Sequence, residues 1–110
     1  MLHLTQETQI LLAVEPVSFH KQIDGLIALC DQALSVNPRS GQLFVFINRA
    51  RTMIRILCYE HGGYWLATKR LSRGRYNLWP NNRGTVSHTL LAADLTKLLK
   101  TYIAPQNKTS

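Results

Sequence analysis

The chain is organised around residues 42–80, which read QLFVFINRARTMIRILCYEHGGYWLATKRLSRGRYNLWP. The run 42–47 is apolar at almost every position, which predicts a central strand that is covered on both faces. Residues 48–51 and 60–63 are short polar links, and the glycines of the second link readily adopt positive φ angles. Both links have the length of β-hairpin connections. The sequence therefore predicts a three-stranded antiparallel meander over residues 42–71.

The segment before the meander predicts an entry strand and one helix. Residues 9–14 form a short apolar run that is typical of a buried strand. Apolar residues at helical spacing then predict a helix near residues 19–34, with Ser18 as its N-cap. Gly25 lies in the middle of that helix, where it should weaken the helix by about 0.5–1 kcal/mol relative to Ala. We expect a close approach of another backbone to explain this glycine.

The segment after the meander predicts a loop, a strand and a second helix. Residues 72–84 contain two glycines and a proline, which indicates a loop. We expect an edge strand at 85–90 and an amphipathic helix at 91–102, followed by a disordered tail at 105–110. This order of elements predicts a single α+β domain over residues 1–104, with an antiparallel sheet packed against two helices.

A two-residue turn at His61-Gly62 would fix which residues share a face of the second hairpin. One face would then be almost wholly apolar and should pack on a helix: Ile54, Ile56, Cys58, Trp65 and Ala67, with Lys69. The other face mixes arginines and tyrosines with apolar residues: Met53, Arg55, Leu57, Tyr59, Tyr64, Leu66, Thr68 and Arg70. That mixture suits nucleic acid, where aromatic rings stack on bases and cations meet phosphate. It equally suits a half-covered sheet whose arginines extend their charged ends to water.

Composition limits the class of protein. Hydrophobic residues make up 45% of the chain, and no apolar run approaches the length of roughly 18 residues that a membrane-spanning helix needs. The N-terminal segment has no early Lys or Arg and is a poor secretory signal, so we expect a cytoplasmic protein without a membrane partner. Cys30 and Cys58 lie in apolar runs, which favours buried reduced thiols over a disulfide or a metal site.

The net charge of +7 is concentrated in one block. Residues 49–83 hold eight of the thirteen Lys and Arg residues against a single acid, Glu60, and seven of those eight cations are Arg. Arg makes planar, bidentate contacts with phosphate and stacks on bases better than Lys does. A localised basic patch is typical of a polyanion binder, although a solubilising face gives the same composition.

Several landmarks in this order and spacing resemble a bacterial family. They are Asp24-Gly25-Leu26 with Lys21, Asn37-Pro38 with Ser40-Gly41, the run 41–46, Asn48-Arg49, Ile54-Arg55-Ile56-Leu57, Lys69-Arg70-Leu71, Gly74-Arg75-Tyr76 and Trp79-Pro80. Over roughly residues 10–100 the chain resembles the small accessory protein, TnpB, from the second reading frame of insertion sequences of the sixty-six family. The unrelated RNA-guided nuclease of the same name is a different protein.

The resemblance implies a protein of a mobile element that is needed alongside a separate, larger transposase. The resemblance implies a role in DNA transposition, but it does not define the biochemical mechanism. The chain departs from the family pattern at His20, Thr52, Tyr59-Glu60 and Ser72, where the family usually has Arg, Asp, Trp-Asp and Glu. Because His20 replaces the usual Arg, the resemblance does not support a role that needs a permanent cation at position 20.

The acidic residues do not form a recognisable catalytic set. Strand transfer by two metal ions needs carboxylates that hold the metals about 3.5–4 Å apart. Asp24 and Asp31 lie seven positions apart on one predicted helix, too far for a shared metal without a third element. The histidines show no metal-ligand spacing, and no Ser or Cys has an evident general base. We therefore expect no catalytic residue, no metal and no cofactor.

Two functional classes remain. The first is a DNA-binding accessory protein that uses Arg49, Arg51, Arg55, Lys69, Arg70, Arg73 and Arg75 on phosphate, with Tyr76 or Trp79 stacking on bases. The second is an adaptor that assembles with the transposase through Trp65, Trp79-Pro80 and Tyr76, because Arg, Tyr and Trp also dominate protein interfaces. Trp79 fits equally well as a plug in the core. The sequence leaves the oligomeric state open, and a homo-oligomer is compatible with it.

Overall fold

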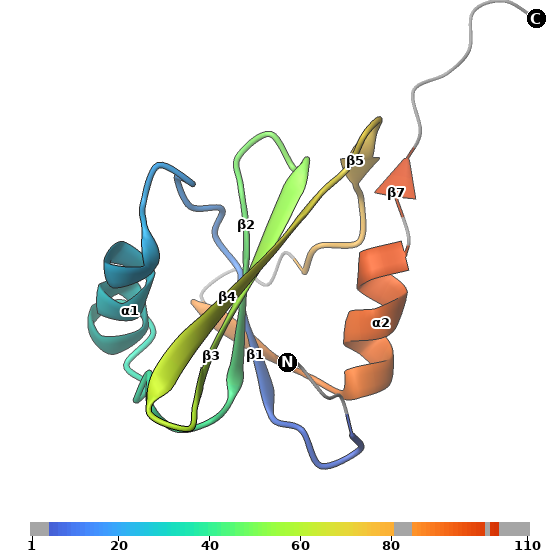
Figure 1. The fold of residues 1–110 in the computed structure, drawn as a ribbon. Helices are drawn as coiled ribbons and strands as arrows, with labels where there is room; N and C mark the ends of the chain where they lie inside the picture. Colours follow the sequence, from blue (N-terminus) through green and yellow to red (C-terminus); the bar gives the residue numbers. More distant parts are fainter. Residues whose placement is uncertain (1–4, 81–84, 101, 104–110) are drawn as a thin grey trace, which may run out of the picture.

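The structure is a computed structural model that describes residues 5–80, 85–100 and 102–103. Two helices lie on opposite sides of a central sheet (Figure 1). In chain order the elements are β1 (Ile10–Ala13), α1 (Ile23–Gln32), β2 (Leu43–Ile47), β3 (Met53–Glu60), β4 (Gly63–Arg70), β5 (Arg75–Tyr76), β6 (Ser87–Leu90), α2 (Ala92–Lys100) and β7 (Tyr102–Ile103).

The main sheet has five strands in the order β4-β3-β2-β1-β6. The predicted meander is confirmed, because β2, β3 and β4 pair antiparallel with their sequence neighbours. The predicted edge strand is also present, since β6 pairs antiparallel with β1. The expectation of a purely antiparallel sheet is wrong, because β1 and β2 are parallel. The physical reason is the crossover through α1, which returns the chain to the end of the sheet where β1 began.

The second hairpin has the predicted register. Glu60 pairs with Gly63 and Cys58 pairs with Trp65. His61 and Gly62 form the two-residue turn with φ angles of 50° and 83°. Positive φ at both positions matches the right-handed twist of the two strands, which explains why a glycine occupies the second of them.

Strand β2 carries the two cores of the protein, one on each of its faces. Leu43, Val45 and Ile47 belong to a core that also contains Leu95 and Leu98 of α2. Phe44 and Phe46, which alternate with them, belong to a second core that includes Leu26 and Cys30 of α1. All five residues of β2 are buried, so the prediction of a central strand covered on both faces is confirmed.

Helix α1 begins four residues later than predicted, and Ser18 is not its N-cap. Residues 18–21 instead form a turn, in which the backbone N–H of Lys21 donates to the carbonyl of Ser18. The hydroxyl of Ser18 accepts a hydrogen bond from the backbone N–H of His20. The expected backbone approach at Gly25 is also wrong, because a Cβ at this position would lie 3.1 Å from Cβ of Lys21. The neighbour is thus a side chain that precedes the same helix.

The loop predicted at 72–84 contributes to the core. It includes the short strand β5, which pairs with β7, and the rings of Tyr76 and Trp79 are buried. Helix α2 ends at Lys100, slightly before the predicted end at 102. Residues 81–84 of this loop and the tail predicted to be disordered at 105–110 lie outside the described residues. Within the described ranges, no helix has both the length and the apolar character that crossing a membrane requires.

Candidate functional site

The turn between β2 and β3 is built by the side chain of Asn48. Its Oδ1 atom accepts hydrogen bonds from the backbone N–H groups of Thr52 and Met53, at 2.9 and 3.0 Å. Its Nδ2 atom donates to Oγ1 of Thr52. Arg51 adopts the left-handed conformation at φ 61° inside this turn, which is uncommon for a residue other than glycine. The amide of Asn48 therefore fixes the backbone that carries Arg49 and Arg51.

This turn is joined to the segment that follows β4. The backbone N–H of Leu71 donates to the carbonyl of Thr52 at 2.9 Å. The backbone N–H of Tyr76 donates to the carbonyl of Arg51 at 2.8 Å. These bonds bring the arginines of residues 49–51 next to those of residues 70–75, although about twenty residues separate the two groups in the sequence.

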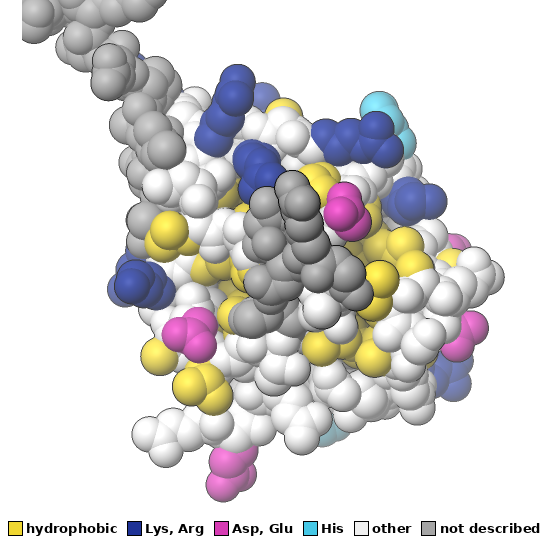
Figure 2. Space-filling model, turned by 180° about the vertical axis from the view of Figure 1, so that it is seen from behind, with side chains coloured by type: hydrophobic (Ala, Val, Ile, Leu, Met, Phe, Trp, Pro, Cys, Tyr) yellow, Lys and Arg dark blue, Asp and Glu magenta, His cyan; other side chains and the backbone are white. Residues whose placement is uncertain are grey.

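We call the resulting surface the basic end, and its members are Arg49, Arg51, Lys69, Arg70, Arg73 and Arg75. All of them except the half-buried Arg51 are exposed. Residues 48–52 and 69–76 contain no Asp or Glu, and the described part of the chain shows no carboxylate paired with these cations. In Figure 2 several Lys and Arg side chains gather at the top of the molecule, the end where Figure 1 shows β5 and β7, whereas most acidic side chains lie lower or at the sides.

Lys69 has a structural contact as well as a place on the basic end. Its Nζ donates to the carbonyl of Leu99 at 2.6 Å, in the last turn of α2. A cation at this position complements the negative end of the helix dipole. Lys69 is therefore held in place by α2 and is less free to follow a ligand than the arginines around it.

Arg55 lies in a groove beside the basic end. Its Nη1 atom donates to the carbonyls of Phe19 and Lys21, at 3.1 and 3.0 Å. The guanidinium carbon lies 4.6 Å from the centroid of the Phe19 ring. The mixed Arg-Tyr face of the hairpin is thus largely covered, since Leu57 is fully buried under α1 and Arg55 holds the segment that leads into that helix. This face therefore does not offer an open surface on which nucleic acid could bind.

Tyr76 and Trp79 lie in the core. Tyr76 is 1% exposed, so its ring is not available to stack on a base, and burial raises the pKa of its hydroxyl. Trp79 is 7% exposed, and its Nε1 donates to the carbonyls of Ala13 and Val14. The structure thus favours the core plug among the alternatives for Trp79, and Pro80 beside it is half-buried.

Trp65 is more exposed than the sequence predicted. It was expected on a packed face, but 52% of it is exposed. It does lie opposite Cys58 as the register required. The core beneath α2, however, contains no residue of the edge strand β4. The signal that could have revealed this is the composition of β4, because polar residues occupy both faces of its second half at Thr68, Lys69 and Arg70.

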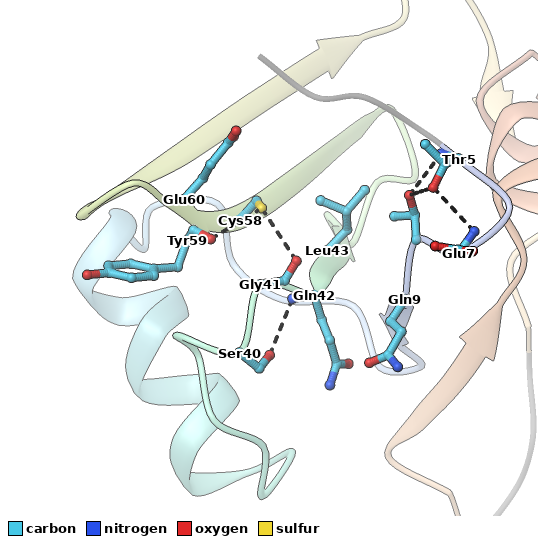
Figure 3. Close-up of a pocket in the computed structure, with 11 residues that line it drawn as sticks. Thr5, Glu7, Gln9, Ser40, Gly41, Gln42, Leu43, Cys58, Tyr59 and Glu60 are labelled. Carbon is cyan, nitrogen blue, oxygen red and sulfur yellow. Dashed lines mark hydrogen bonds between the residues drawn. The ribbon is translucent and has the colours of Figure 1, made fainter.

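A cavity of about 610 Å³ lies at the end of the molecule opposite the basic end (Figure 3). Glu7, Ser40, Cys58 and Glu60 are among its lining residues, and none of the lining residues is His, Lys or Arg. The thiol of Cys58 donates weakly to the carbonyl of Gly41 at 3.8 Å, and burial raises its pKa. A protonated thiol without an adjacent base is a poor nucleophile, so this cavity lacks the parts of a cysteine active site.

The other thiol lies deeper in the protein than that of Cys58. Cys30 lies on α1 and is fully buried against the sheet, and burial raises its pKa from 9.0 to about 11. Both cysteines are free thiols, as the sequence predicted. In the part of the chain that the structure describes, His, Cys, Asp and Glu side chains form no group of three that could hold a metal ion.

Comparison with known proteins identifies the family. The family model described as IS66 Orf2 like protein matches residues 8–108. The chain belongs to this family. Membership suggests an accessory protein of transposition, which agrees with the resemblance in the sequence, and the family is not known to be catalytic.

Two curated relatives come from Sinorhizobium fredii. The chain is 30% identical to the uncharacterized protein y4jC over 86 residues, which cover 78% of this chain and 74% of the relative. It is 31% identical to the uncharacterized protein y4hO over 84 residues, which cover 76% and 72% of the two chains. No solved structure matches the chain.

Proposed function

We propose that this IS66 Orf2-like protein assists transposition by binding DNA through its basic end. The observation that carries the proposal is the meeting of six cations from the β2–β3 turn and residues 69–75 at one end of the sheet, without an acid in either segment. Five of the six are exposed and none is paired with a carboxylate among the described residues. Such a surface attracts a polyanion, and each cation that meets a phosphate releases condensed counterion.

The polarity of the molecule supports an oriented approach to DNA. Glu7 and Glu60 line the cavity at the opposite end, and Asp94 lies in the first turn of α2. Separated charges of opposite sign turn the basic end toward a polyanion during diffusion. Phosphate contacts carry no sequence information of their own, so the proposed binding is largely independent of sequence.

Charge removal at the two ends of the molecule tests the proposal. Arg73→Gln and Arg75→Gln remove exposed cations from the basic end. Arg39→Gln is the matched control, because Arg39 is exposed but lies over the Tyr59 ring near the opposite end. Affinity for a random duplex scales with salt concentration to about the power −0.9 for every phosphate that a cation neutralises. At about 0.1 M salt, removing one such cation should therefore lower the affinity roughly eight-fold.

The expected result is a large loss of affinity in the Arg73 and Arg75 variants and nearly unchanged binding in the Arg39 variant, measured by fluorescence anisotropy. Equal losses in all three variants would mean that only net charge matters and would contradict a localised interface. Thermal melting of each variant checks that the fold is retained.

An adaptor that binds the transposase is the second candidate, and the exposure of Trp65 favours it. Trp65 projects from β4, an edge strand of eight residues whose outer side pairs with no other strand among the described residues. Such an edge accepts an additional strand from a partner, and an exposed Trp beside it can anchor the contact. If this candidate is right, Trp65→Ser should abolish association with the transposase while leaving the affinity for DNA unchanged.

A further inference from the structure

A groove of about 650 Å³ lies between the segment 17–20 and the β2–β3 turn. Its lining combines apolar walls with polar and cationic groups, among them His20, Asn48, Arg49 and Arg55. Two arginines and a histidine face this space, and no Asp or Glu lines it. The groove therefore has the character of a site for an anion.

Arg55 is the fixed cation of this groove. Phe19 lies against its guanidinium, and both N–H groups of Nη1 are used by the carbonyls of Phe19 and Lys21. Its Nε is buried and has no partner in the described structure, and no carboxylate there pairs with Arg55. The charge is thus partly removed from water without a counter-ion, which is unfavourable unless an anion completes it.

The same contacts also pre-organise Arg55. A guanidinium that is clamped by two carbonyls and an aromatic ring loses little side-chain entropy when it binds a ligand. Its Nη2 group is not fully buried and makes no hydrogen bond within the described residues, so it is the part of the guanidinium that is available to a ligand. Arg49 lines the same groove and is exposed, so its side chain is also available to a ligand.

We propose that this groove is a binding site for a single phosphate group, held between Arg55 and Arg49. The planar guanidinium matches the geometry of phosphate oxygens, and the bonds that form are charge-assisted. The natural source of the phosphate is DNA, as either an internal phosphodiester or a terminal phosphate. This choice of source rests on the proposed function. The groove adjoins the basic end through Arg49, so one DNA molecule can reach both.

Titration of the full chain with inorganic phosphate tests the site without any DNA. Backbone amide resonances in residues 18–20 and 48–53 should shift and saturate in the millimolar range, at constant ionic strength set with chloride. Arg49→Gln should weaken this binding about ten-fold or more, because it removes a charge-assisted contact. Arg39→Gln is the matched control and should leave the phosphate affinity unchanged, because Arg39 lies over the Tyr59 ring near the opposite end. Arg55→Lys, used only if its melting temperature is retained, should also weaken binding.

Shifts that do not saturate, that spread evenly over the surface, or that persist unchanged in Arg49→Gln would overturn the proposed site. Two duplexes, with 5′-hydroxyl or 5′-phosphate ends, then identify the source. If both compete with inorganic phosphate for the groove, the site takes internal phosphodiesters; if only the phosphorylated duplex competes, it takes strand ends. A phosphate site that neither duplex reaches would contradict the DNA source. Loss of DNA binding by the basic end with an intact phosphate site would instead contradict the proposed function.

Discussion

Trp79 gives a direct test of how the segment after the meander is held in place. Its ring is 7% exposed in the core beneath α2, and its Nε1 bonds to two carbonyls at the end of β1, at 3.0 and 3.1 Å. Trp79→Ala removes the ring and the donor together. Truncation of a buried Trp side chain destabilises a protein by about 3–5 kcal/mol. Loss of the indole donor to the two carbonyls destabilises the protein by about 1 kcal/mol or more in addition.

The matched control is Trp65→Ala, because Trp65 is the other tryptophan and is 52% exposed on β4. We expect it to change the free energy of unfolding by less than about 1 kcal/mol. Trp79→Phe separates the two contributions of Trp79, since it retains most of the packing. It should destabilise the protein by about 1–2 kcal/mol, because the two carbonyls no longer receive the indole N–H.

Urea unfolding followed by circular dichroism measures these differences. With a slope of about 2 kcal/mol per molar urea, Trp79→Ala should lower the midpoint by roughly 2–3 M and Trp65→Ala by less than about 0.5 M. Each variant also leaves one tryptophan as a fluorescence reporter, which should be shielded from acrylamide at position 79 and quenched at position 65. Equal midpoints, or a freely quenched Trp79, would refute the placement of Trp79 in the core.

Two further predictions concern the turn and the buried thiol. Gly62→Ala should destabilise the protein by about 1 kcal/mol more than Gly63→Ala in the same urea assay, because only Gly62 has a positive φ angle, at 83°; equal effects would contradict the two-residue turn. Burial raises the pKa of Cys30 from 9.0 to about 11, so the folded state keeps its proton where the unfolded state has released it, and stability should fall as pH rises from about 9 to 11. Cys30→Ala should remove that part of the pH dependence, and a slope that remains unchanged in the variant would show that another group causes it.

The sequence specified the strands and their register where local chemistry was decisive. Alternation in 53–70 and the His61-Gly62 turn determined the hairpin, and the continuous apolar run of β2 required two covered faces. The parallel pairing of β1 with β2 was not predictable from local pattern, because it depends on where the chain returns after α1. Which strand lies beside β1 depends on the path of the whole chain and not on the local sequence.

The positions of the functional side chains were harder to predict for the same reason. Alternation assigned Trp65 to the correct face of the hairpin. Whether that face is covered at β4 depends on how far the core beneath α2 reaches, and it ends before this edge strand. Tyr76 and Trp79 follow an arginine-rich loop whose composition gives no sign of burial. The sequence left a place in the core open for Trp79, whereas the burial of Tyr76 was not predicted. The clustering of Arg49 with Arg73 was expected from charge alone, whereas the bonds that join their segments are tertiary.

The salt dependence of binding to random duplex tests the claim that DNA is bound by phosphate contacts at the basic end. If roughly four to six of these cations engage phosphate, the slope of log K against log salt should lie near −4 to −5, at about −0.9 per contact. Arg73→Gln or Arg75→Gln should each flatten the slope by about one unit without lowering the melting temperature, while Arg39→Gln should leave it unchanged. A slope near zero, or one that neither substitution at the basic end alters, would contradict the claim.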